Sequence, residues 1–228
     1  MAPVWYILGV FGIVLQLVVI YLMTKGFYRK YPWVFGYLLV LFFTSVADFA
    51  GWSILDPSDQ SDLPAYLLND TIRHFSAFLA VVSLFLAATA EHPRRRSLRW
   101  RVISISLLFV AGSLLWNSPS ISDPATYYTY VFRDVSFITA LLNVVLWFSL
   151  VRNRTTDRVL YLVSGGLGLN MAGVAIAESL YALSDATAVL VNLLGVGSHL
   201  LCLLIWIKAF RLSPGAQKMP SREPTPFS

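Results

Sequence analysis

The sequence predicts an all-α, polytopic integral membrane protein: a seven-transmembrane-helix bundle with its N-terminus outside and its C-terminus in the cytoplasm. Three observations predict this fold class: the composition, seven long apolar runs, and basic residues confined to one side. Of the 228 residues, 57% are hydrophobic and 13% are charged, and the mean hydropathy is +0.67. Soluble domains carry about 25% charged residues, so this chain lacks the charge needed to cover a water-exposed surface.

Seven apolar runs are long enough, or nearly long enough, to cross a bilayer. About 20 helical residues are needed for about 30 Å of hydrocarbon. The expected spans are 3–24, 33–55, 66–90, 102–116, 127–151, 159–183 and 187–210. The fourth run is short by this criterion, and it is retained because the charge pattern requires an odd number of spans. We therefore expect one bundle over residues 1–211, followed by a Pro- and Ser-rich tail, 212–228, that is disordered in the cytoplasm.

Lysine and arginine predict the orientation. All of them except Arg73 and Arg133 lie at the end of, or after, the first, third, fifth or seventh run, while the N-terminus and the remaining breaks contain none. Basic loops stay in the cytoplasm. We expect a multi-pass protein of the cell membrane, in a bacterial cytoplasmic membrane, with the lipid bilayer as its first partner. The net charge of +5 then reports orientation and does not predict nucleic-acid binding.

Polar residues inside the spans gather at one depth. At 1.5 Å per residue, most of them lie roughly 7–11 Å beneath the outer surface, with one histidine deeper. The candidate ligand-binding or ionic network consists of Asp48, Asn69, Asp70, Arg73, His74, Arg133, Asp134, Glu178, Asn192 and His199. A charge at membrane depth is costly unless it faces a partner or a water-filled cavity. The pattern therefore predicts a polar chamber that opens outward.

Sequence spacing suggests how these charges pair. Asp70 and Arg73 are three residues apart and can pair on one helical face. Arg133 is expected to reach a carboxylate on another span, Asp48 or Glu178. Four carboxylates against two guanidinium groups leave an excess of negative charge, which a protonated histidine or a bound cation would balance. A purely structural network that fixes helix register stays open as the alternative.

Other polar and small residues indicate packing between helices. We expect Gln16, Asn143 and Asn170 to form interhelical hydrogen bonds. Gly168 with Ala172, and Gly173 with Ala177, are spaced so that a second helix can approach closely. A faint internal repeat relates spans one to three to spans five to seven, with span four as a linker; it compares LQLVVIYLMTKGFYRKYPWVF from Leu15 with LNVVLWFSLVRNRTTDRVLYL from Leu142.

Several chemistries lack their required residues. The single cysteine, Cys202, excludes an intrachain disulfide and a cysteine metal cluster. Residues 187–207 contain no lysine for a retinal Schiff base. His74 and His199 differ in depth, which argues against a haem held between them. Neither a nucleophile elbow nor a phosphate-binding glycine loop is present. The sequence thus predicts no cofactor, no metal and no catalytic residue.

Three functions remain as expectations. The first is a carrier of a small solute or ion that uses the outward chamber. The second is a seven-span sensor that binds an external ligand and signals through its basic cytoplasmic loops, either as a homo-oligomer or through a separate signalling partner. The third is a membrane-embedded metal hydrolase, which would need three metal ligands around one point. The ligand is expected to be a small molecule or an ion in the first two cases.

Overall fold

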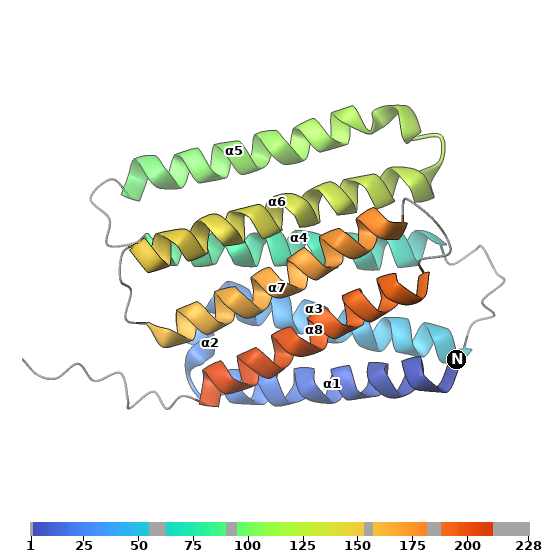
Figure 1. Cartoon of the computed structure of the whole chain (residues 1–228), viewed down its shortest axis with the longest axis horizontal. Coiled ribbons are helices and arrows are strands. Elements are labelled where there is room, and N and C mark those ends of the chain that lie inside the picture. Colours follow the sequence, from blue (N-terminus) through green and yellow to red (C-terminus); the bar gives the residue numbers. More distant parts are fainter. Residues whose placement is uncertain (1, 55–62, 90–94, 153–156, 182–187, 212–228) are drawn as a thin grey trace, which may run out of the picture.

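The computed structural model is built from helices alone over the residues that it describes, 2–54, 63–89, 95–152, 157–181 and 188–211 (Figure 1). The long helices are α1 (Ala2–Thr24), α3 (Pro32–Ile54), α4 (Leu63–Ala88), α5 (Arg95–Trp116), α6 (Pro124–Arg152), α7 (Arg158–Tyr181) and α8 (Ala188–Arg211). Two short elements, α2 (Phe27–Lys30) and the 3-10 turn η2 (Ser118–Ser120), join them. The predicted tail, 212–228, lies outside the described residues.

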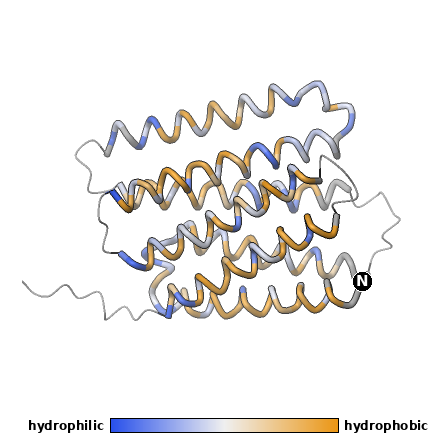
Figure 2. Tube along the Cα trace, viewed as in Figure 1, coloured by the Kyte–Doolittle hydropathy of each residue, from blue (hydrophilic) through white to orange (hydrophobic). Residues whose placement is uncertain are grey.

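Seven of these helices are long and apolar enough to cross a membrane. Hydrophobic residues run along all of them, and hydrophilic residues gather mainly toward the helix ends (Figure 2). The fourth span is longer than expected because α5 begins at Arg95, inside the basic stretch. Its 22 residues reach about 33 Å at 1.5 Å per residue. Arginine side chains can extend from such a helix end to the membrane surface, which is why hydropathy alone underestimated its length.

Six helices form a closed ring. The neighbouring pairs are α1–α3, α3–α4, α4–α6, α6–α7, α7–α8 and α8–α1, and α4 also contacts α7. Consecutive long helices run in opposite directions (Figure 1). The ring therefore consists of two sets of three, α1–α3–α4 and α6–α7–α8, that meet at parallel contacts. This order agrees with the weak repeat in the sequence.

Helix α5 lies outside the ring at one edge of the bundle, against α6 (Figure 1). Only 17% of its candidate span is buried. Leu107, Leu108 and Leu115 are among its exposed side chains, and exposed apolar side chains on a spanning helix face lipid. Because α5 reverses the chain once more, α1 and α6 can run in the same direction.

Alternation of the helices brings the basic residues to one end of the bundle. The exposed ones are Lys25, Arg29, Lys30, Arg96, Arg99, Arg101, Arg152, Arg158, Lys208 and Arg211. The main hydrophobic core fills the half of the ring nearest this basic end. It includes five side chains that are no more than 1% exposed, those of Met23, Leu38, Leu84, Leu167 and Trp206. The candidate polar residues occupy the opposite half, as the sequence predicts.

The turn after α1 depends on a glycine. Gly26 has φ +121°, a conformation that side-chain-bearing residues rarely adopt. It closes the end of α1 by donating its amide hydrogen to the Met23 carbonyl at 3.2 Å. The chain can then form α2 and bury Tyr31, which is 4% exposed and belongs to the hydrophobic core.

Candidate functional site

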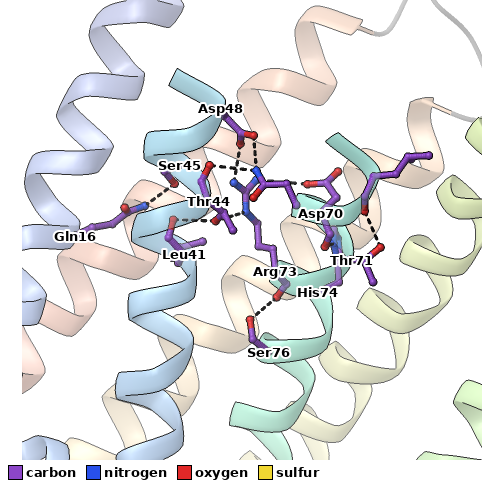
Figure 3. A network of polar contacts seen from close by, with 12 residues as sticks. Gln16, Leu41, Thr44, Ser45, Asp48, Asp70, Thr71, Arg73, His74 and Ser76 are labelled. Atoms are coloured by element: carbon purple, nitrogen blue, oxygen red, sulfur yellow. Dashed lines mark hydrogen bonds and ion pairs between the residues drawn. The ribbon is translucent and has the colours of Figure 1, made fainter. Parts of the chain in front are cut away.

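Arg73 is the centre of a polar network between α3 and α4 (Figure 3). Its Nη2 lies 2.7 Å from Asp48 Oδ2, and its Nη1 lies 3.5 Å from Asp70 Oδ1. Its Nε donates to Thr44 Oγ1 at 3.2 Å. The Asp70–Arg73 pair predicted from spacing is therefore confirmed, and the second carboxylate comes from the neighbouring helix.

Asn69 extends the same contact between α3 and α4. Its Nδ2 donates to the Thr44 carbonyl at 3.1 Å and also to Asp48 Oδ1. Asp48 thus accepts from Asn69 through one oxygen and from Arg73 through the other. Each carboxylate oxygen of Asp48 therefore has a hydrogen-bond donor. Because Thr44 and Asp48 are four residues apart on α3, they present one face to α4.

His74 joins this network to α6. The side chain is 8% exposed, and its ring stacks on Phe132 with centroids 4.8 Å apart and planes 4° apart. Nδ1 lies 2.8 Å from the Asp70 carbonyl. A carbonyl only accepts, so Nδ1 carries the hydrogen in this contact.

Gln16 connects three helices on the other side of the network. Its Nε2 lies 3.1 Å from Ser45 Oγ on α3 and 3.1 Å from His199 Nε2 on α8. His199 in turn lies close enough to Arg73 for their charges to interact. The expected interhelical role of Gln16 is thus confirmed. Within the described part of the chain, its Oε1 has no hydrogen-bond partner.

Tyr37 and Asn170 mark the inner edge of the polar region. Asn170 Nδ2 lies 3.4 Å from the Tyr37 hydroxyl, which links α7 to α3. The Tyr37 ring packs edge-on against Trp206, whose Nε1 donates to the Val163 carbonyl at 3.0 Å. Asn170 therefore bonds between helices, as predicted. Below this layer lies most of the hydrophobic core.

The remaining predicted residues have different surroundings. Glu178 lies within electrostatic range of Asp70, and in the described part of the structure its side chain makes no hydrogen bond or ion pair. Asn192 is exposed on α8, and over the described residues no polar contact joins its side chain to the network. For Asn143, Nδ2 lacks a partner among the described residues, so its expected interhelical bond through that atom is not seen.

Arg133 and Asp134 belong to a separate cluster. Arg133 Nη2 pairs with Asp134 Oδ1 at 2.9 Å, and its guanidinium lies 5.1 Å from the Tyr130 ring centroid. Ser113 Oγ and Asn117 Nδ2 donate to Asp134 Oδ2 at 2.8 and 3.0 Å. Our expectation that Arg133 pairs with Asp48 or Glu178 is wrong. At about 100° per residue, positions 133 and 134 turn away from the ring when Phe132 faces His74.

Sequence reasoning missed several partners. Thr44, Ser45, Tyr37, Ser113 and Asn117 all bond the predicted residues, yet each is a neutral residue common in spans. Thr44 and Ser45 carried one usable signal, since both lie within four residues of Asp48 on the same helix. Tyr37 carried none, because a tyrosine near a helix end also suits the membrane surface.

A second polar contact closes the basic end of the ring. Asp157 accepts from Lys30 Nζ at 2.8 Å and from the Tyr31 hydroxyl at 2.8 Å, and it caps α7 by accepting from the Val159 and Leu160 amides at 3.1 and 3.2 Å. Partial burial would raise the pKa of this carboxyl, but the donors from Lys30, Tyr31 and Leu160 outweigh it and lower the pKa. Burial, with the Asp157 charge, raises the pKa of Tyr31.

The fold and these contacts define an all-α protein with seven candidate membrane-spanning helices, one polar network inside the ring and one polar contact at the basic end. Comparison of the chain with protein-family models, curated proteins and solved structures finds no match. Within the described ranges, no three His, Cys, Asp or Glu side chains gather as ligands of a metal ion would.

Proposed function

We propose that the chain is a membrane carrier of a small solute or ion, with the Arg73 network as its binding site. The observation that carries this proposal is the location of that network inside a ring formed by two three-helix sets. Asp48, Asn69, Asp70 and Arg73 come from one set, whereas Glu178 and His199, within electrostatic range of Asp70 and Arg73, come from the other. A site between two bodies that can rock against each other is a common transporter plan.

The half of the ring below the network supplies the closed gate that a carrier needs. Tyr37 and Trp206 pack across the ring interior, and the hydrophobic core continues to the basic end. There, Lys30 and Tyr31 of the first set hold Asp157 at the start of α7. The Tyr37–Trp206, Lys30–Asp157 and Tyr31–Asp157 contacts all join the two sets. A rocking motion that opened the basic end would therefore break all three together. In this proposal the basic end is cytoplasmic and the membrane is a bacterial cytoplasmic membrane.

Transport is tested with the purified protein in liposomes. We expect uptake of at least one solute from a panel of cations, amines, sugars and organic acids, and loss of that uptake in Arg73→Met. Lys25→Met is the matched control, because Lys25 is an exposed basic residue whose ammonium lies over the Tyr21 ring, 4.6 Å from its centroid. Uptake that is equal in Arg73→Met and wild type would overturn the assignment of this site.

Gate opening is tested with the single cysteine. Cys202 is 3% exposed in α8, within the closed half. We expect Asp157→Ala to increase the rate at which a membrane-impermeant thiol reagent, added from the basic end, modifies Cys202. A rate unchanged from wild type would mean that the Asp157 contact does not hold this end closed. Cys202→Ala supplies the unlabelled background.

A sensor is the second candidate, and one observation favours it. The polar network lies in one half of the bundle only, while exposed arginines such as Arg99 and Arg101 present a basic surface at the opposite end. A sensor would bind the same ligands without moving them, so binding without uptake in the liposome assay would favour it. The hydrolase has no such support, because the described residues provide no set of three metal ligands.

A further inference from the structure

Two buried phenylalanines bring basic side chains of α2 and α8 together at one corner of the basic end. The rings of Phe27 and Phe210 pack with their centroids 5.2 Å apart, and both belong to the hydrophobic core. Arg29 lies two residues after Phe27, and Arg211 directly follows Phe210. Figure 1 shows α2 beside the end of α8. The aromatic contact therefore fixes the backbone from which these basic residues project.

Three cations at this corner have no counter-charge among the described residues. Arg29, Lys208 and Arg211 are exposed, and within the described ranges none of them forms an ion pair. In the described part of the chain, the one carboxylate at this end of the bundle is Asp157, which is already paired with Lys30 at 2.8 Å. A surface with one sign of charge attracts ligands of the opposite sign, so this corner favours an anion.

Arg29 is held by its neighbour with donors to spare. Its Nε donates to the Tyr28 hydroxyl at 2.9 Å, and its guanidinium carbon lies 5.6 Å from the Tyr28 ring centroid. Over the described residues, its two terminal nitrogens have no acceptor. A guanidinium presents its N–H groups in a planar fork that matches the oxygens of a phosphate. These terminal nitrogens can therefore bind a phosphate without breaking the contact with Tyr28.

Exposed apolar side chains lead along two neighbouring helices to this corner. On α8, Leu201 and Leu204 are 52% and 47% exposed, and Lys208 and Arg211 continue the same face at helical spacing. On α1, which lies beside α8, a second exposed stripe runs toward the same end and consists of Val10, Val14, Leu17 and Tyr21. Aromatic rings of spanning helices gather at the level of the lipid headgroups. Both outer faces thus suit acyl chains whose headgroup lies at the basic end.

We propose that this corner binds an anionic phospholipid, with its phosphate on Arg29, Lys208 and Arg211 and its acyl chains along the outer faces of α1 and α8. A soluble anion would use the cations and leave unused the apolar stripes that end at them, so a lipid fits both features. Because α2 belongs to the first three-helix set and α8 to the second, the bound lipid joins the two sets at the basic end. The proposal depends neither on the Arg73 network nor on transport.

Binding is tested by thermal unfolding of the purified full-length protein in mixed micelles of constant total lipid content. Phosphatidylglycerol replaces phosphatidylcholine stepwise, and parallel samples in phosphatidylcholine receive inorganic phosphate at the same concentrations. We expect phosphatidylglycerol to raise the unfolding temperature with a saturating dose dependence, and inorganic phosphate to leave it unchanged. An equal shift with inorganic phosphate would overturn the proposal in favour of a soluble anion. The absence of any shift with phosphatidylglycerol would also overturn it.

Variants separate this corner from the general charge of the basic end. We expect Lys208→Gln combined with Arg211→Gln to raise the phosphatidylglycerol concentration at half-maximal shift about tenfold, since each basic residue near a membrane surface contributes to the attraction. The matched control combines Arg99→Gln with Arg101→Gln, which removes the same charge from exposed positions of α5, and it should keep the wild-type dose dependence. If the α8 variant does not fold, Arg29→Gln tests the site from α2, with an expected weakening of about fivefold. Equal weakening in the α5 control would show diffuse attraction to the whole basic end and would overturn the assignment of this corner.

Discussion

At the scale of single residues, the protein is organised by a few polar side chains that each satisfy several partners. Arg73 donates to three residues, and Asp48 accepts from two. Asp134 in the second cluster accepts from Ser113 and Asn117 as well as Arg133. Loss of Arg73 should therefore cost more stability than loss of Arg133, because the carboxylates around Arg73 depend on it more than Asp134 depends on Arg133.

Replacing each arginine by methionine separates these roles. We expect Arg73→Met to lower the free energy of unfolding by about 3 kcal/mol, the lower end of the range for a buried pair, because the side chain keeps 26% of its surface exposed. Arg133, at 36% exposed, should cost about 0–1 kcal/mol. Denaturant titration in mixed micelles measures both. Equal costs would contradict the distinction between the two clusters.

Asp157 makes a pH-dependent contribution with a defined sign. Its pKa is lowered in the folded protein, so its stabilisation is complete above the unfolded-state pKa of about 3.9 and is lost as pH falls through the folded value. Asp157→Asn resembles the protonated side chain. We expect it to be about 1 kcal/mol less stable than wild type from pH 5 to 8, with the gap closing below about pH 4. A gap that persists at low pH would rule out this origin.

At the scale of elements, α7 approaches α8 so closely at Gly166 and Gly173 that neither position has room for a Cβ. A Cβ on Gly173 would overlap Ser198, and one on Gly166 would lie 2.9 Å from Trp206 Cδ1 and 3.3 Å from the Cys202 carbonyl. Gly168 faces Asn143 of α6 in the same way. The small residues of α7 thus make close packing possible, which is the role that their spacing favours, and gating motion is not needed to explain them.

Two separate glycine-to-alanine substitutions test this packing. We expect Gly173→Ala to destabilise the protein by about 1–3 kcal/mol through overpacking. Gly36→Ala in α3 is the matched control, since a Cβ there meets nothing within 4 Å; it should be neutral or stabilising by up to about 1 kcal/mol. Thermal unfolding of the two variants side by side gives the comparison. If Gly173→Ala behaves like Gly36→Ala, the α7–α8 contact tolerates more separation than the structure implies.

At the scale of the whole molecule, polarity is divided between the two ends of the ring. Basic residues and the hydrophobic core share one half, and the polar network occupies the other. We expect this division to give the bundle a preferred direction in a membrane, because basic ends are retained in the cytoplasm. The peripheral α5 preserves this division by reversing the chain between the two three-helix sets.

Orientation is measured by placing new cysteines in a Cys202→Ala background. We expect an impermeant thiol reagent added to intact cells to label Ile121→Cys, whose side chain is 67% exposed at the polar end, and to leave Arg211→Cys unlabelled until the cells are opened. Arg211 is exposed at the basic end. Labelling in the opposite order would show that the basic end faces outward.

By itself, the sequence determined the number of long apolar helices, their alternation and the half of the bundle that holds the polar residues. These follow from apolar length, basic breaks and the rise of a helix, which are local properties of the chain. It also determined the Asp70–Arg73 pair, because residues three apart share a helical face. The early start of α5 escaped it, since arginines at a helix end lower the hydropathy without ending the helix.

Only the tertiary structure decided which polar residues meet. Asp48 faces Arg73 and Arg133 faces Asp134 because the rotation of each helix is set by packing, such as the His74–Phe132 stack and the glycines of α7. The ring order, the position of α5 and the contact of Asp157 with Lys30 and Tyr31 are likewise non-local. A one-residue change turns a helical side chain by about 100°, so depth can be read along the sequence while partners cannot.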